Sequence, residues 1–155
     1  MLRPESVSEI RVVALGSIRR GEELLVQEIE ANDAGGRNYR LLGGGVEFGE
    51  HSREALHREF DEELGVTLDD VSPVGTYERV FDHEGRRQHE VWRVYEAAIV
   101  EDWPYERAEF SFVEPDLGVE LRATWKRPRE LRSGPDRLYG ETLLDDLGSE
   151  PHSAQ

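Results

Sequence analysis

Residues 44–66 read GGVEFGEHSREALHREFDEELGV, and they contain the strongest helix pattern of the chain. Residues 52–64 include no glycine or proline, and Gly65 follows them directly. Serine is a favoured residue at the start of a helix, and glycine readily adopts the left-handed conformation that ends one. The sequence therefore predicts a helix over residues 52–64, with Ser52 as its N-cap.

One side of this predicted helix carries both apolar and acidic side chains. At about 100° per residue, Leu56, Phe60 and Leu64 form a single apolar stripe that faces the core. Glu63 falls within about 20° of Leu56, and Glu59 lies about 60° from it. An unpaired buried charge costs several kcal/mol, and carboxylates at i and i+4 repel each other. We therefore expect a cation between Glu59 and Glu63.

The composition restricts which cation this is. The chain has no cysteine, which excludes disulfides, thiolate zinc sites, iron–sulfur clusters and a cysteine nucleophile. Carboxylate oxygens suit a hard divalent ion, so Mg²⁺ or Mn²⁺ fits best. The glycine run at residues 43–45 would let the backbone approach such a ligand closely and offer carbonyl oxygens to it.

Length and charge limit the wider interpretation. The chain has 155 residues, which predicts one domain over residues 1–148 and a disordered tail over residues 149–155. Its 19 Lys and Arg stand against 34 Asp and Glu, and a net charge of -15 disfavours binding to bulk nucleic acid. No apolar run approaches the ~20 residues that cross a bilayer, and the first residues lack a signal-peptide core. We expect a cytoplasmic protein that does not bind membranes.

Apolar runs separated by turn residues predict the remaining elements. Two hairpins are expected, and a loop, a short strand and a second helix should follow them. The predicted strands are residues 10–18, 23–29, 39–42, 74–81, 90–100 and 121–125, with a loop at 101–118 and a helix at 139–147. This order of strands and helices indicates an α/β fold in layers, with a mixed sheet.

The spacing within residues 44–66 resembles the Nudix box of the Nudix hydrolase superfamily. Five residues separate Gly44 from Glu50, and seven more precede residues 58–66, which read REFDEELGV. Every defining position is filled, and residue frequencies alone give a chance match on the order of 10⁻⁵. Leu42 stands where many members carry proline, which bears on substrate preference. The resemblance implies an α/β/α sandwich that hydrolyses a nucleoside diphosphate linked to another group.

The resemblance also assigns roles to residues of the box. Glu59 and Glu63 are the expected metal ligands, Glu62 is a third ligand or the general base, and the Gly44 carbonyl is an added ligand. Such ions would neutralise the phosphates while a carboxylate takes a proton from the attacking water.

Outside the metal site, the resemblance implies that Arg58 and Glu50 form an ion pair that orients Glu59. The general base of this superfamily varies and often comes from a late loop. The chain offers Glu106, Glu109, Glu114 and Glu120 there, and we choose Glu120, just before the predicted strand at 121–125.

Three functions remain to be compared. The leading one is a metal-dependent pyrophosphohydrolase acting on a nucleoside diphosphate derivative. The alternative is a nucleotide-sensing module on the same fold that does not hydrolyse its ligand; loss of carboxylates would be expected there, yet all three box glutamates are present. A generic acidic interaction domain fits poorly, because Glu63 falls beside the apolar stripe. The choice of nucleoside diphosphate derivative and the oligomeric state, with a homodimer among its options, stay open.

Overall fold

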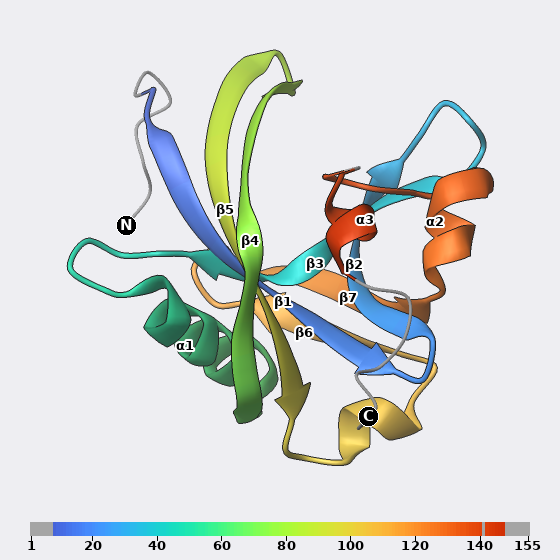
Figure 1. Ribbon diagram of the computed structural model, residues 1–155. Helices are drawn as coiled ribbons and strands as arrows, with labels where there is room; N and C mark the ends of the chain where they lie inside the picture. The colour runs from blue at the N-terminus through green and yellow to red at the C-terminus, as the bar shows by residue number, and fades with distance from the viewer. Residues whose placement is uncertain (1–7, 141, 148–155) are drawn as a thin grey trace.

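The computed structural model describes residues 8–140 and 142–147. In chain order the elements are β1 (Ile10–Arg20), β2 (Glu23–Ala31), β3 (Arg37–Gly45), α1 (Ser52–Leu64), β4 (Leu68–His83), β5 (Arg86–Ile99), η1 (Trp103–Glu106), β6 (Glu109–Glu114), β7 (Val119–Lys126), α2 (Pro128–Ser133), β8 (Arg137–Leu138) and α3 (Leu143–Asp146). Figure 1 shows their arrangement.

The strands form one mixed sheet in the order β4-β5-β1-β3-β2-β7-β6, and β8 pairs with β3. β1 runs parallel to β5, and β3 runs parallel to β8, whereas the other pairs are antiparallel. The predicted mixed α/β fold is therefore confirmed.

β3 lies at the centre of this sheet and joins its two halves. Its C-terminal part pairs with β1, and its N-terminal part pairs with β2. The predicted first hairpin is consequently short, because β1 and β2 pair directly only at Arg19 with Leu24 and at Arg20 with Glu23. The predicted second hairpin is present in full as β4 and β5.

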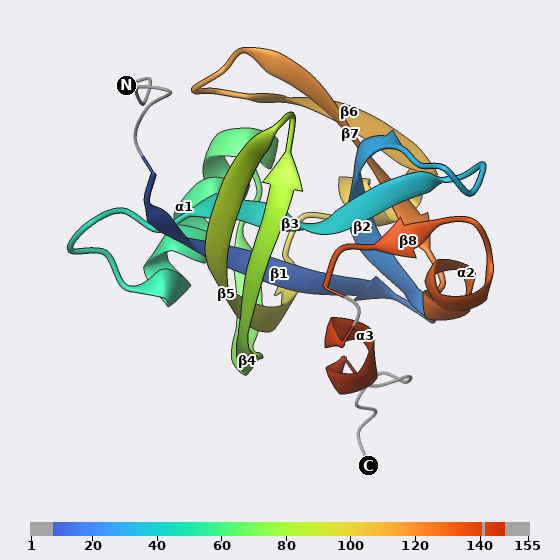
Figure 2. The ribbon, with the colours of Figure 1, turned by 90° about the horizontal axis from the view of Figure 1, so that it is seen from above.

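Helices cover both faces of the sheet. In Figures 1 and 2, α1 lies on one side of β1 and β3, and α2 and α3 lie on the other. Alternate residues of β1 enter separate cores: Ala14 and Ile18 pack with Leu56 and Phe60 of α1. The core on the other face contains Val13 and Leu15, together with Leu131, Leu143 and Leu144 of the C-terminal helices. A strand buried on both faces explains the apolar run over residues 13–15, whereas Val12 before it is exposed.

Two predicted segments differ from the structure. The loop predicted at 101–118 contains η1 and β6, and Phe110 and Phe112 alternate there with exposed residues. The helix predicted at 139–147 extends only over Leu143–Asp146. It cannot begin at Tyr139, since Gly140 has a φ of 85° and packs against the ring of Trp92.

The predicted tail at 149–155 lies outside the described residues. No helix within 8–140 or 142–147 is both long enough and apolar enough to cross a membrane.

Candidate active site

α1 has the predicted bounds, but its N-cap lies one residue before the predicted one. His51, and not Ser52, is the N-cap: its Nδ1 accepts a hydrogen bond from the Arg53 amide at 3.1 Å. The Glu54 carboxylate in turn accepts from the His51 amide at 3.1 Å, which completes a capping box. The Ser52 hydroxyl instead lies 2.6 Å from the Tyr95 hydroxyl, so it ties the helix start to β5.

The glycine run ends β3 and brings the strand against α1. Gly43, Gly44 and Gly45 pair with residues 13–15 of β1. A Cβ built on Gly44 would lie 2.3 Å from the carboxyl carbon of Glu59, and one on Gly43 would lie 1.9 Å from the Ala14 carbonyl oxygen. Only glycine at position 44 therefore lets the Glu59 carboxylate lie directly on the strand, where it is just 8% exposed.

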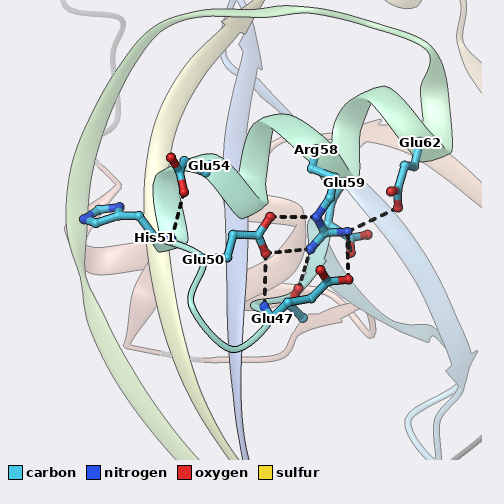
Figure 3. A network of polar contacts seen from close by, with 8 residues as sticks. Glu47, Glu50, His51, Glu54, Arg58, Glu59 and Glu62 are labelled. Carbon is cyan, nitrogen blue, oxygen red and sulfur yellow. Dashed lines mark hydrogen bonds and ion pairs between the residues drawn. The ribbon is translucent and has the colours of Figure 1, made fainter. Parts of the chain in front are cut away.

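Arg58 organises the segment between β3 and α1 (Figure 3). Its Nε and Nη2 donate to the two carboxylate oxygens of Glu50, at 2.7 and 3.0 Å. Nη2 also donates to the Gly45 carbonyl at 2.9 Å. Nη1 donates to Glu59 at 3.0 Å and to Glu62 at 3.2 Å. The guanidinium thus holds the entry loop, the end of β3 and the Glu59 carboxylate in one arrangement.

This network corrects one expectation from the helical wheel. Two residues after Leu56, Arg58 falls on the side of the helical wheel away from the apolar stripe, but its side chain is only 24% exposed because the 46–51 loop folds back over it. The Arg58 hydrogen bonds hold the pKa of Glu50 below its usual value. Bonds to Glu50 and Glu59 raise the pKa of Arg58 in turn. The Glu62 carboxylate is turned toward Arg58 and stays 45% exposed.

Three carboxylates meet beside this network. Oxygen atoms of Glu59, Glu63 and Glu114 all lie within 4.8 Å of one another. Glu59 and Glu63 come from successive turns of α1, and Glu114 comes from the end of β6. The Leu117 amide donates to Glu114 Oε1 at 2.9 Å, so the turn after β6 fixes the orientation of that carboxylate. Three oxygens at this spacing suit one hard divalent cation.

The structure does not bring Glu120 to this group. Glu120 pairs in register with Val113, which is exposed, and directly opposed side chains lie on the same face of a sheet. Phe112 and Glu114 point to the other face, toward α1. Glu106 and Glu109 are also exposed, and Glu109 pairs with Arg122 at 2.7 Å. Of the four late glutamates, only Glu114 reaches the cluster.

Burial makes the cluster electrostatically unfavourable without a cation. Burial and the nearby charge of Glu59 raise the pKa of Glu63 from 4.5 to about 8. Burial also raises the pKa of Glu59, although its hydrogen bonds with Glu63 and Arg58 oppose this. The Glu59–Glu63 pair therefore holds a proton more tightly than free carboxyl groups do, and a bound cation would displace that proton.

The raised pKa gives the metal-free protein a specific pH dependence. The folded state binds the Glu63 proton more tightly than the unfolded chain does. The protonated carboxyl therefore contributes its full share of folding stability below about pH 4.5, and this contribution is lost as the pH rises to about 8. A pKa difference of one unit corresponds to about 1.4 kcal/mol, so the free energy of unfolding should fall by a few kcal/mol. Urea unfolding in EDTA across this range measures it.

Glu63→Gln provides the comparison for this prediction. The variant cannot titrate at position 63, so its free energy of unfolding should fall much less over the same pH range. Mg²⁺ should stabilise the wild type at the alkaline end and should stabilise the variant less. Parallel pH profiles for the two proteins in EDTA would contradict the prediction.

Comparisons with known proteins agree with this geometry. The sequence model of the NUDIX domain matches residues 9–140. The fold is similar to that of a MutT NUDIX hydrolase from Burkholderia pseudomallei, with a TM-score of 0.60 and 24% identity over 91% of this chain and 100% of that one. The E. coli ORF135 protein gives a TM-score of 0.53 and 22% identity over 93% of this chain and 92% of that one. No curated protein sequence matches the chain.

The family match covers most of the chain and includes the whole acidic cluster. The chain therefore belongs to the NUDIX domain family. The predicted resemblance to this family is confirmed.

Proposed function

We propose that the chain hydrolyses the diphosphate linkage of a nucleoside diphosphate derivative and that it uses Mg²⁺ or Mn²⁺ bound at Glu59 and Glu63. The observation that supports this most directly is the approach of the Glu59, Glu63 and Glu114 oxygens to within 4.8 Å of one another. Three partly desolvated acids at this spacing fit a divalent cation, because they repel each other without one.

The cation would neutralise the phosphate oxygens and lower the pKa of a bound water. Glu59 and Glu63 would hold it from one face of α1, and the Gly44 carbonyl, at the point where Glu59 meets β3, is a further proposed ligand. Arg58 and Glu50 position Glu59, since the Arg58 guanidinium bonds both carboxylates.

The proton of the attacking water needs an acceptor. Glu114 is the proposed general base, in place of Glu120, because one of its oxygens is held by the Leu117 amide and its carboxylate reaches the cluster. Glu62 is the second candidate for the base. It ranks below Glu114 because its carboxylate is already paired with Arg58. Loss of acid–base assistance usually slows a reaction by about 10²–10⁴.

The experiment that tests this function is a screen in which chromatography detects the two phosphorylated products of each hydrolysed substrate. Nucleoside triphosphates, sugar nucleotides, dinucleoside polyphosphates and nucleotide coenzymes would be offered with Mg²⁺, with Mn²⁺ and with EDTA. We expect turnover of at least one class with metal and none with EDTA. Tight metal-dependent binding without turnover of any class would instead favour a nucleotide-sensing module. A cytoplasmic location, a homodimer and the absence of nucleic acid partners stay predictions.

A further inference from the structure

Arg40 is a cation beside the acidic cluster that the mechanism above does not use. It lies on β3, and its side chain runs along the strand toward the glycine run. Its Nε donates to the Leu41 carbonyl at 3.1 Å, and its Nη2 donates to the Gly43 carbonyl at 3.5 Å. Gly43 directly precedes Gly44, against which the Glu59 carboxylate packs. The guanidinium is therefore anchored at the edge of the proposed metal site.

No carboxylate of the described residues pairs with Arg40. Both of its hydrogen bonds go to backbone carbonyls, and no carboxylate oxygen among residues 8–140 and 142–147 lies within ion-pair distance. Arg58, which bonds Glu59 of the cluster itself, is by contrast within ion-pair distance of four carboxylates. Arg40 thus keeps a donor-rich side chain without an anion to receive it.

The surroundings make that unpaired charge unfavourable. Burial lowers the pKa of Arg40, while the charges of Glu90 and Glu63 oppose the shift and that of Arg11 adds to it. The attraction to Glu63 and Glu59 would disappear once a divalent cation occupied the cluster, because the cation neutralises the same carboxylates. In the metal-bound protein a partly buried guanidinium would then face a second cation.

An anionic ligand removes this conflict. A guanidinium presents its donors in a planar fork that matches two phosphate oxygens, and such bonds to charged groups are stronger than neutral ones. Arg53 and Arg93 of the described residues also bond no carboxylate, so what sets Arg40 apart is its position beside the acidic cluster, where its charge acts on Glu63. We propose that Arg40 binds a phosphate of the substrate beside the metal cluster, an inference that rests on the proposed diphosphate substrate.

A purely structural role makes a different prediction. If Arg40 only balances the charges of Glu59 and Glu63, its removal should change metal binding and stability but leave phosphate binding intact. If Arg40 binds phosphate, its removal should weaken phosphate binding and leave the affinity for Mg²⁺ alone unchanged or higher, because a repelling charge has been taken away.

Titration calorimetry with α,β-methylene-ADP as a non-hydrolysable probe separates these roles. Wild type, Arg40→Gln, Arg40→Lys and Arg129→Gln would be titrated with Mg²⁺ alone and then with the probe in saturating Mg²⁺. Arg129 is an exposed residue of α2, on the other face of the sheet, so it controls for the loss of one positive charge. We expect Arg40→Gln to bind the probe at least about tenfold more weakly, or about 1.4 kcal/mol. Arg129→Gln should stay within about twofold of wild type.

Two results would overturn the proposal. One is probe affinity in folded Arg40→Gln equal to that of Arg129→Gln. The other applies if Arg40→Gln does not fold: Arg40→Lys replaces the fork by a single ammonium, so it should lose about threefold or more, and an unchanged affinity contradicts the inference. If the wild type turns over a substrate but the Arg40 variants bind the probe as tightly as the wild type, the hydrolase function holds and the role of Arg40 is wrong. If probe binding depends on Arg40 but the wild type turns over no substrate, the role of Arg40 in phosphate binding holds and the hydrolase function is wrong.

Discussion

Glu63→Gln should reduce turnover to less than about a tenth of the wild-type rate while the protein stays folded, a loss of more than 1.4 kcal/mol of transition-state stabilisation. Glutamine preserves the shape of the side chain but removes a charge from the three-carboxylate cluster. Without metal the variant should be the more stable protein at alkaline pH, because burial raises the pKa of Glu63 to about 8. The steady-state rate of formation of the phosphorylated products and thermal melting measure the two effects.

Asp61→Asn is the matched control for this variant. Asp61 lies on the same helix but is exposed, and the substitution removes the same charge. Its turnover should stay close to that of the wild type. If Glu63→Gln keeps more than about a tenth of wild-type turnover, the assignment of Glu63 as a metal ligand is wrong.

Glu114→Gln should slow hydrolysis by about 10²–10⁴, the range typical of losing a general base. The amide of glutamine can still occupy the position that the Leu117 amide fixes, but it cannot accept the proton of water. Because Glu59 and Glu63 remain, Mg²⁺ binding should weaken less than it does in Glu63→Gln. Single-turnover rates at saturating Mg²⁺, together with calorimetric metal affinities, provide the comparison.

Glu120→Gln tests the position that the sequence favoured. Glu120 is exposed on the face of β7 that points away from the cluster, so this variant should react at nearly the wild-type rate. If Glu120→Gln reacts slowly and Glu114→Gln reacts at the wild-type rate, Glu120 is the general base and Glu114 is not. Wild-type rates in both variants would move the role of base to Glu62.

Local patterns in the sequence predicted the parts of the fold that depend on neighbouring residues. The absence of glycine and proline before Gly65 predicted the bounds of α1, and its C-cap indeed has a φ of 68°. The wheel position of Glu59 predicted its burial, since it lies next to the apolar stripe of Leu56 and Phe60. These arguments require only the 3.6-residue period of a helix.

The position of Glu114 could not be predicted in the same way. Its proximity to Glu63 depends on β6 being the edge strand beside β7 and on the face of β6 that turns toward α1. The alternation of Phe110, Phe112 and Glu114 carried part of this signal, because the three share one face of a strand. Two prolines and mixed charge in residues 101–118 favoured a loop instead. The ion pair of Arg58 with Glu50 was expected, but the burial of Arg58 was missed for a related reason, since the 46–51 loop returns over it.

Hydrolysis of an accepted substrate in ¹⁸O-labelled water shows which atom of the substrate the water attacks. If water attacks phosphorus at the Glu59, Glu63 and Glu114 cluster, mass spectrometry should find one labelled oxygen on a phosphate product and none on a sugar or base carbon. The reaction should require Mg²⁺ or Mn²⁺ and should stop in EDTA. Label on carbon, or equal incorporation with and without metal, would contradict the account.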